Sequence, residues 1–159
     1  LAAGGRHDEA RAEGARAAEL EAMERASVVD RRESDPRLAE IERHVAKAGA
    51  ARRAGVLGIA AAAYLAAANG YAALDDSDAA IDACLHGLEA QPGNIDIHFV
   101  MTMLYLRRGW IELGVQRARL IEQRLDIDDD PLRRNALGAL AQDFRSRSPE
   151  LERLAAAAP

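Results

Sequence analysis

The chain has 159 residues and a formal net charge of -5 at pH 7, and it is 49% hydrophobic but only 4% aromatic. Much of the hydrophobic share is alanine, the best helix former, and no run rich in valine, isoleucine, threonine and aromatic residues marks a strand. We therefore predict an all-α chain of single-domain length. Charges of both signs are mixed and form no basic stripe, which argues against a nucleic-acid partner.

The first predicted helix covers residues 5–25. Small residues follow one another at Ala10, Gly14 and Ala17, a spacing that resembles the second helix of a helical hairpin. Because no first helix precedes it, we expect the chain to begin in the middle of a repeat. Residues 1–26 are therefore interpreted as a half repeat.

The second predicted helix starts after Ser34 or Asp35, either of which can cap it, with Pro36 at its first position. Its apolar residues recur at spacings of three and four and make one stripe, formed by Leu38, Ile41, Val45 and Ala48. The segment 27–60 as a whole fits no repeat, so we interpret it as a connecting helix or a degenerate repeat.

The rest of the chain predicts a run of short helices separated by turn residues. Asp76 or Ser77 can cap one of them, Pro92-Gly93-Asn94 stops it, and Asp130-Pro131 and Ser148-Pro149 start the last two. The expected helices cover residues 59–74, 77–90, 95–108, 110–125 and 131–144, followed by a short one from residue 149.

Residues 54–74 contain no charged residue, a length that could cross a bilayer. The segment is mostly alanine with several glycines and few leucine, isoleucine or valine residues, so we do not expect a membrane span. Cys84 is the single cysteine, which predicts neither a disulfide framework nor a cysteine metal cluster. With no charged-then-apolar secretory leader, a cytoplasmic location is expected.

Similar residues recur with a period of 34 in the middle of the chain, where Tyr105 follows Tyr71 at that spacing. A fixed period in this range predicts stacked helical hairpins, in which each hairpin covers the apolar face of the next. The pattern resembles two tetratricopeptide repeats over residues 61–128. The residues that carry the resemblance are Tyr64, Ala67, Ala68, Tyr71, Ala80, Cys84, Gly87 and Pro92, then His98, Met101, Thr102, Tyr105, Gly114, Ala118 and Ile121, with Asp126 in place of the closing proline.

The resemblance implies a short right-handed solenoid of stacked hairpins, closed by capping helices in residues 129–159. It also implies a concave groove, lined by the first helix of each hairpin, that binds a protein or peptide. The groove positions carried over are Leu65, Asn69, Asp96, Phe99, Met103, Leu106 and Arg107. Leu65 stands where relatives that grip a terminal carboxylate need a lysine, so no such clamp is predicted.

Phe99, Met103 and Leu106 recur at spacings of four and three and share one helical stripe. Such a strip is either an interaction surface or is covered by another part of the chain. The helices after Pro131 are the natural internal cover, because the first of them has an apolar stripe of its own, formed by Leu137, Leu140 and Phe144.

No pattern for catalysis or metal binding emerges. The four histidines form no pair at ligand spacing, and the acidic run 126–131 lacks the glycine and glutamate of a calcium loop. No nucleophile–base pair or phosphate-binding loop is present, so we expect neither enzyme activity nor a cofactor. His98 is expected to pack inside its hairpin, and Trp110 to lie either on a neighbouring hairpin or against a partner.

Two functional hypotheses follow. In the first, the chain is a helical-repeat adaptor that binds a protein or peptide in its groove. In the second, it is an architectural, sensor or oligomerisation arm of a larger regulator, whose groove its own helices fill; a homo-oligomer stays open under this hypothesis.

Overall fold

The computed structural model describes residues 16, 18–23 and 35–157. The chain divides into two compact units, Leu1–Ala39 and Glu40–Pro159. The predicted half repeat 1–26 lies mostly outside the described residues, although residues 18–23 are helical. In the first unit, the Asp35 carboxylate accepts a hydrogen bond from the Arg37 backbone N–H and pairs with the Arg37 guanidinium at 2.7 Å.

All regular secondary structure in the described part of the chain is helical, as predicted. The helices are α2 (Pro36–Arg53), α3 (Leu57–Ala73), α4 (Ser77–Ala90), α5 (Ile95–Arg107), α6 (Ile111–Asp128), α7 (Pro131–Phe144) and α8 (Pro149–Ala156), with a 3-10 turn, η1 (Arg145–Arg147), before α8. Because α3 begins at Leu57, residues 57–60 of the predicted connecting segment belong to the first helix of the predicted repeat pair.

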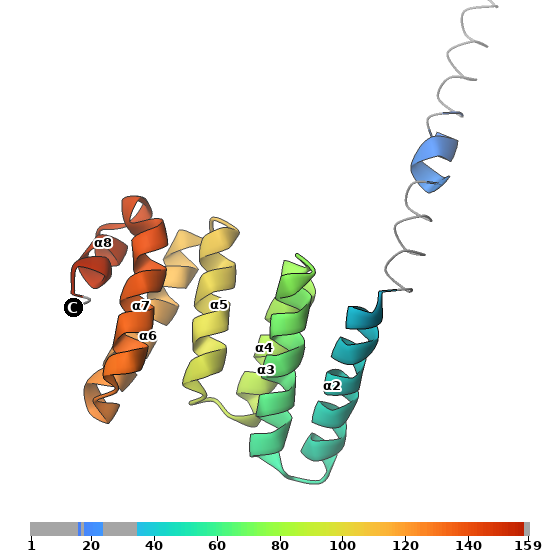
Figure 1. Ribbon diagram of the computed structural model, residues 1–159, viewed down its shortest axis with the longest axis horizontal. Coiled ribbons are helices and arrows are strands. Elements are labelled where there is room, and N and C mark those ends of the chain that lie inside the picture. The colour runs from blue at the N-terminus through green and yellow to red at the C-terminus, as the bar shows by residue number, and fades with distance from the viewer. Residues whose placement is uncertain (1–15, 17, 24–34, 158–159) are drawn as a thin grey trace, which may run out of the picture. The chain divides into compact units, whose positions relative to one another are not determined.

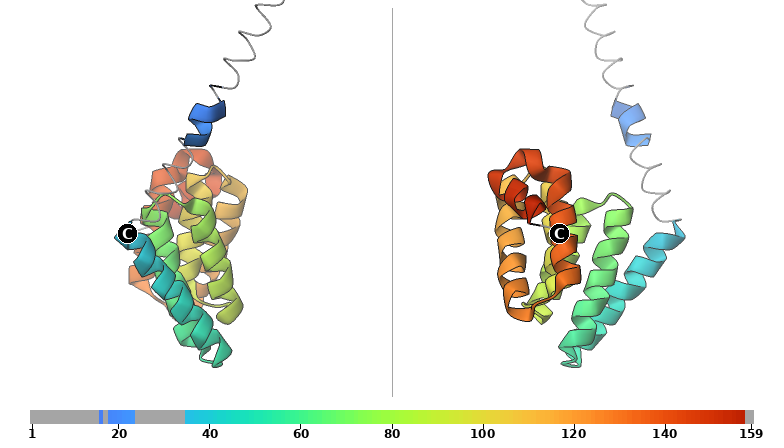
Figure 2. Two further views of the ribbon diagram at one scale, coloured as in Figure 1. Left: turned by 90° about the vertical axis from the view of Figure 1, so that its right-hand side faces the viewer. Right: turned by 60° about the vertical axis from the view of Figure 1, so that its left-hand side comes forward.

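Successive helices pair as antiparallel hairpins. The pairs α3 and α4, α5 and α6, and α7 and α8 make the most extensive contacts. Within the Glu40–Pro159 unit, α3, α5 and α7 lie side by side in one layer, and α4 and α6 lie behind them (Figure 1). Seen from two further sides, α2 lies next to α3 at the N-terminal end of this unit (Figure 2). This packing is consistent with helical repeats.

Side chains at the helix starts satisfy backbone N–H groups that have no partner within the helix. Asp76 accepts from the Ala79 N–H, and Asp130 accepts from the Arg133 N–H. These two caps were expected. Asn94 also caps α5, by accepting from the Ile97 N–H, although the sequence predicted it only as a helix stop. Helix α6 runs to Asp128 rather than ending near residue 125, and Asp129 ends it in the left-handed conformation with φ 46°.

Alanine builds the contact between α3 and α4. Ala60, Ala61, Ala67 and Ala68 of α3 and Ala80 of α4 are completely buried. Gly87 lies at the same contact: a Cβ placed there would come within 3.3 Å of the Tyr64 Cβ and 2.6 Å of the Ile97 Cδ1. The small side chains therefore allow the two helix backbones to approach closely.

Larger side chains fill a second core, which joins α5 and α6 to the C-terminal helices. Its buried members are Leu106, Val115, Ala118, Ile121, Leu125, Leu137, Ala141, Leu151 and Leu154. At its edge, Gly114 of α6 faces α5: an added Cβ would lie 2.5 Å from Cδ2 and 2.7 Å from Cγ of Leu106.

We expect Gly114→Ala to lower the free energy of unfolding by about 1–3 kcal/mol, because the methyl group overlaps Leu106. The matched control is Gly58→Ala, since a Cβ at Gly58, in the first turn of α3, meets nothing within 4 Å. That control should stabilise the protein by about 0.5–1 kcal/mol through the lower entropy of the unfolded chain. Urea denaturation of the two variants measures both effects. If both substitutions change the free energy of unfolding in the same direction, the result would contradict the close approach of α5 and α6.

Candidate protein-interaction face

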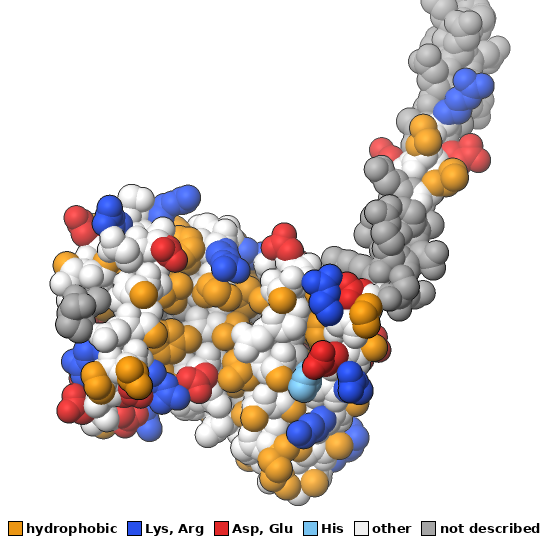
Figure 3. Space-filling model, in the orientation of Figure 1, with side chains coloured by type: hydrophobic (Ala, Val, Ile, Leu, Met, Phe, Trp, Pro, Cys, Tyr) orange, Lys and Arg blue, Asp and Glu red, His pale blue; other side chains and the backbone are white. Residues whose placement is uncertain are grey.

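The layer formed by α3, α5 and α7 exposes a face to which α3 contributes no charge. Helix α3 contains no charged residue, and Ala62, Asn69 and Ala73 lie exposed along it, with Leu65 half-buried beside them. On this face, hydrophobic side chains gather in the hollowed middle, over α5 and its boundaries with the neighbouring helices (Figure 3). Predicted groove residues Leu65 and Asn69 therefore lie on an accessible apolar surface.

Helix α5 contributes one exposed line of side chains to the same face. Asp96, Met103 and Arg107 follow one another at spacings of seven and four, which places them on one side of the helix. Met103 is half-buried, and Asp96 and Arg107 are exposed. No carboxylate of the described residues pairs with the Arg107 guanidinium, so this cation is available to a partner.

The structure buries the predicted apolar strip at one position and partly covers it at another. Leu106 is only 2% exposed and belongs to the core that joins α5 and α6 to α7 and α8. Phe99 is half-buried and packs against the same core, where Leu140 and Phe144 of α7 also lie. Both side chains thus belong to a core that continues into the helices after Pro131, the second of the two outcomes that the sequence allowed. Met103 alone of the three keeps an accessible position outside that core.

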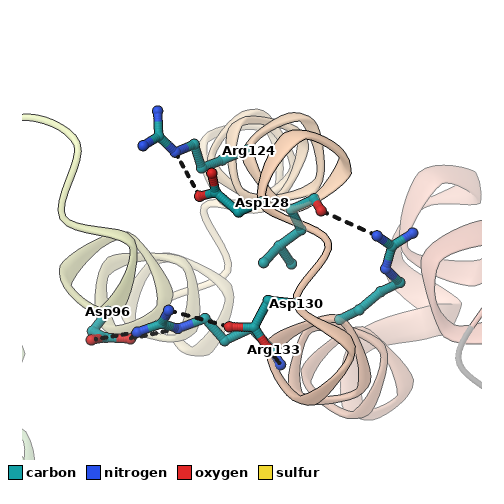
Figure 4. A network of polar contacts seen from close by, with 7 residues as sticks. Asp96, Arg124, Asp128, Asp130 and Arg133 are labelled. Atoms are coloured by element: carbon teal, nitrogen blue, oxygen red, sulfur yellow. Dashed lines mark hydrogen bonds and ion pairs between the residues drawn. The ribbon is translucent and has the colours of Figure 1, made fainter.

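A polar network fastens the start of α7 to α5 (Figure 4). The Arg133 guanidinium binds both Asp96 carboxylate oxygens, at 2.9 and 3.1 Å, and pairs with Asp130 at 3.3 Å. Nearby, Arg134 donates to the Leu125 carbonyl oxygen at 3.1 Å. Exposed pairs contribute about 0.2–1 kcal/mol each. The network therefore contributes more to the orientation of α7 than to the stability of the fold. The negative charge of Asp96 is neutralised by Arg133.

Trp110 lies at the turn between α5 and α6, where two neighbours hold it. Its ring centroid is 5.7 Å from that of Tyr105, and the Arg108 guanidinium carbon lies 5.0 Å from the indole centroid. Arg108 also pairs with Asp78 of α4 at 2.6 Å. Because Trp110 is still 43% exposed, these contacts cover only part of the ring.

His98 packs between helices, as the sequence predicts. Its Nε2–H donates to the Pro92 carbonyl oxygen at 2.9 Å, and its Nδ1 accepts from the Arg117 guanidinium at 3.0 Å. This arrangement requires the neutral ring. Burial, together with the positive charge of Arg117, lowers the pKa of His98 below 6.5.

We expect the protein to lose stability as pH falls from about 7.5 to about 5.5, because unfolded His98 takes up a proton near pH 6.5 whereas folded His98 resists it. The contribution is fully present above that pH and is lost on acidification. His98→Gln, whose amide can still donate to Pro92, should show a smaller loss over the same range. Melting temperatures at the two pH values measure this, and equal losses in both proteins would contradict the neutral ring.

Two further candidates in the described part of the chain are the Cys84 thiol and clusters of metal-binding side chains. Cys84 is fully buried, and its burial raises the pKa of the thiol to about 12. Among the described residues, no group of three or more histidine, cysteine, aspartate or glutamate side chains is placed to hold a metal ion. None of the helices in the described part of the chain has the length and apolar character to cross a membrane.

Comparisons with protein-family models, with curated proteins and with solved structures found no match to this chain.

Proposed function

We propose that the chain is a non-catalytic, cytoplasmic module of tetratricopeptide type, a short right-handed solenoid that binds a protein or peptide along the face of α3 and α5. The observation that carries the proposal is the uncharged surface of α3 beside Met103 and Arg107 of α5, whose guanidinium pairs with no carboxylate of the described residues. A surface of this kind typically marks an interaction site.

The packing of small residues supports the repeat assignment. Ala80 and Gly114 stand 34 residues apart, and both are buried where the second helix of a hairpin meets the first. The contact surface that we propose differs from the predicted strip. It centres on Leu65, Asn69, Met103 and Arg107, because Leu106 is internal and α7 shares Phe99.

The test is selection from a library of random linear peptides displayed on phage, panned against the immobilised chain. The wild-type protein should enrich a family of related sequences. Met103→Asp should weaken their binding at least about tenfold, the effect expected when a charge enters an apolar contact. Asn69→Arg, an exposed position, is the second variant should Met103→Asp fold poorly. The proposal is abandoned if no sequence is enriched, or if both variants bind the enriched peptides like the wild type.

A second candidate function is an architectural arm of a larger regulator. The core that Phe99 and Leu106 share with α6, α7 and α8 favours it, because part of the predicted groove is filled by the chain itself. Under this hypothesis the wild-type protein enriches no peptide, so the same selection distinguishes the two functions.

A further inference from the structure

The outer side of α6 carries a row of exposed aliphatic residues that the fold does not use. Leu113 is 44% exposed, Leu120 is 50% exposed and Ile127 is 77% exposed. They stand seven residues apart along an 18-residue helix, which is about 27 Å long. A seven-residue spacing keeps side chains on one face, so the three residues form a single seam.

The residues around the seam show that it is distinct from the core-facing side of the helix. Gly114, Val115, Ala118, Ile121 and Leu125 are buried on the opposite side. The exposed Gln116 and Gln123 flank the seam without charge, and the charge of Arg124, which stands between Leu120 and Ile127, is paired with Asp128 at 2.9 Å. At the N-terminal end, an open hollow lined by Gly109, Trp110, Ile111, Glu112 and Leu113 continues the seam, apolar except for the Glu112 carboxylate. An apolar helix face of this pattern suits a second helix packed along it.

Arg117 indicates the charge of that second helix. It stands four residues after Leu113 and three before Leu120, at the border of the seam, and is half-buried. Its guanidinium donates to the neutral His98 ring, and no carboxylate of the described residues pairs with it. By contrast, Arg119 pairs with Glu150, and Arg124 pairs with Asp128 at 2.9 Å. A half-buried guanidinium with free donors binds a carboxylate in preference to other groups.

A second copy of α6 supplies that carboxylate poorly, because three of the four acidic residues of the helix already pair with arginines. Glu122 pairs with Arg153, Asp126 with Arg134 and Asp128 with Arg124. In a parallel pair, Arg117 would face Arg117 of the copy. In an antiparallel pair centred on Leu120, it would lie opposite Gln123, between Glu122 and Arg124. Like charges brought together in this way oppose association.

We propose that the outer face of α6 docks an amphipathic helix of a partner protein, with aliphatic residues along Leu113, Leu120 and Ile127 and an aspartate or glutamate facing Arg117. Trp110, at the end of the seam, anchors the partner at the hollow, a role for which tryptophan is enriched at interfaces. This face is separate from the α3 and α5 surface, so the two proposals stand or fall independently.

The test uses a displayed library of single helices, built on one stable helical scaffold and randomised only at positions of one face spaced three and four apart. Panning on the wild-type chain should enrich aliphatic residues along the face and an acidic residue at one flanking position. Binding of a selected helix should weaken about tenfold or more for Leu120→Asp and stay unchanged for Ala46→Asp at an exposed position of α2.

The acidic residue is tested from both sides. Arg117→Gln should abolish the preference for an acid while preserving aliphatic contacts. In case that variant folds poorly, the selected helix with its acid changed to the amide is measured against the wild-type chain, and it should bind about tenfold more weakly. The proposal is overturned if the library yields no enriched helix, or if the enriched helices bind Leu120→Asp as tightly as the wild-type chain. It is also overturned if changing the acid of the selected helix to the amide leaves its affinity unchanged. Sedimentation that finds a wild-type dimer and a monomeric Leu120→Asp variant would also overturn it, because a second copy of the chain would then occupy the seam.

Discussion

Ala80→Trp should unfold the protein or lower its free energy of unfolding by about 1–3 kcal/mol or more. Ala80 has no exposed surface and lies on the side of α4 that packs against α3. The alanine-built contact leaves no room there for an indole, because Gly87, two turns further along α4, already approaches the Tyr64 Cβ. Helices that approach so closely cannot separate without exposing the rest of the interface.

The matched control for this prediction is Ala46→Trp, in the middle of α2, where the alanine is exposed. An exposed position should tolerate the same change within about 0.5 kcal/mol. Thermal unfolding followed by circular dichroism measures both variants. Equal melting temperatures would show that α3 and α4 do not pack through their small residues.

Leu106→Ala should destabilise the protein by about 2–5 kcal/mol, the cost of a cavity at a buried leucine. Leu106 is 2% exposed and lies where the core of α6, α7 and α8 meets α5. Its neighbour Arg107, exposed and without an ion pair in the described residues, is the control, and Arg107→Ala should change stability by less than about 0.5 kcal/mol. Urea denaturation that finds both variants as stable as wild type would mean that Leu106 belongs to an open groove after all.

Local signals in the sequence predicted the helices well. The turn and cap residues Asp76, Asp130 and Ser148 act as expected, because N-capping depends on a side chain and backbone N–H groups two or three residues away. Asn94 was missed as a cap since Pro92 and Gly93 beside it gave a stop signal of their own. The end of α6 was placed too early because the left-handed residue that ends it is Asp129 rather than a glycine.

The candidate site was harder to predict, because periodicity identifies an apolar stripe but not the neighbour that covers it. The spacing of Phe99, Met103 and Leu106 is correct for one side of α5, yet two of the three belong to the core shared with α6, α7 and α8. The ion pair between Asp96 and Arg133 joins residues 37 positions apart, so no local sequence pattern predicts it. Leu113, Leu120 and Ile127 have the seven-residue spacing of a helical seam. The repeat pattern, however, concerns only Gly114, Ala118 and Ile121, which lie on the other side of α6.

The most direct test of the proposed binding face follows the methyl groups of the methionines by NMR while a peptide selected from the random library is added. The chain has three methionines, of which Met103 is half-buried on the proposed face and Met101 is fully buried on the other side of α5. Met103→Leu assigns the Met103 signal. The Met103 methyl resonance should shift with peptide concentration until it saturates, with Met101 much less affected. A saturating peptide that leaves Met103 unmoved would contradict binding along α3 and α5.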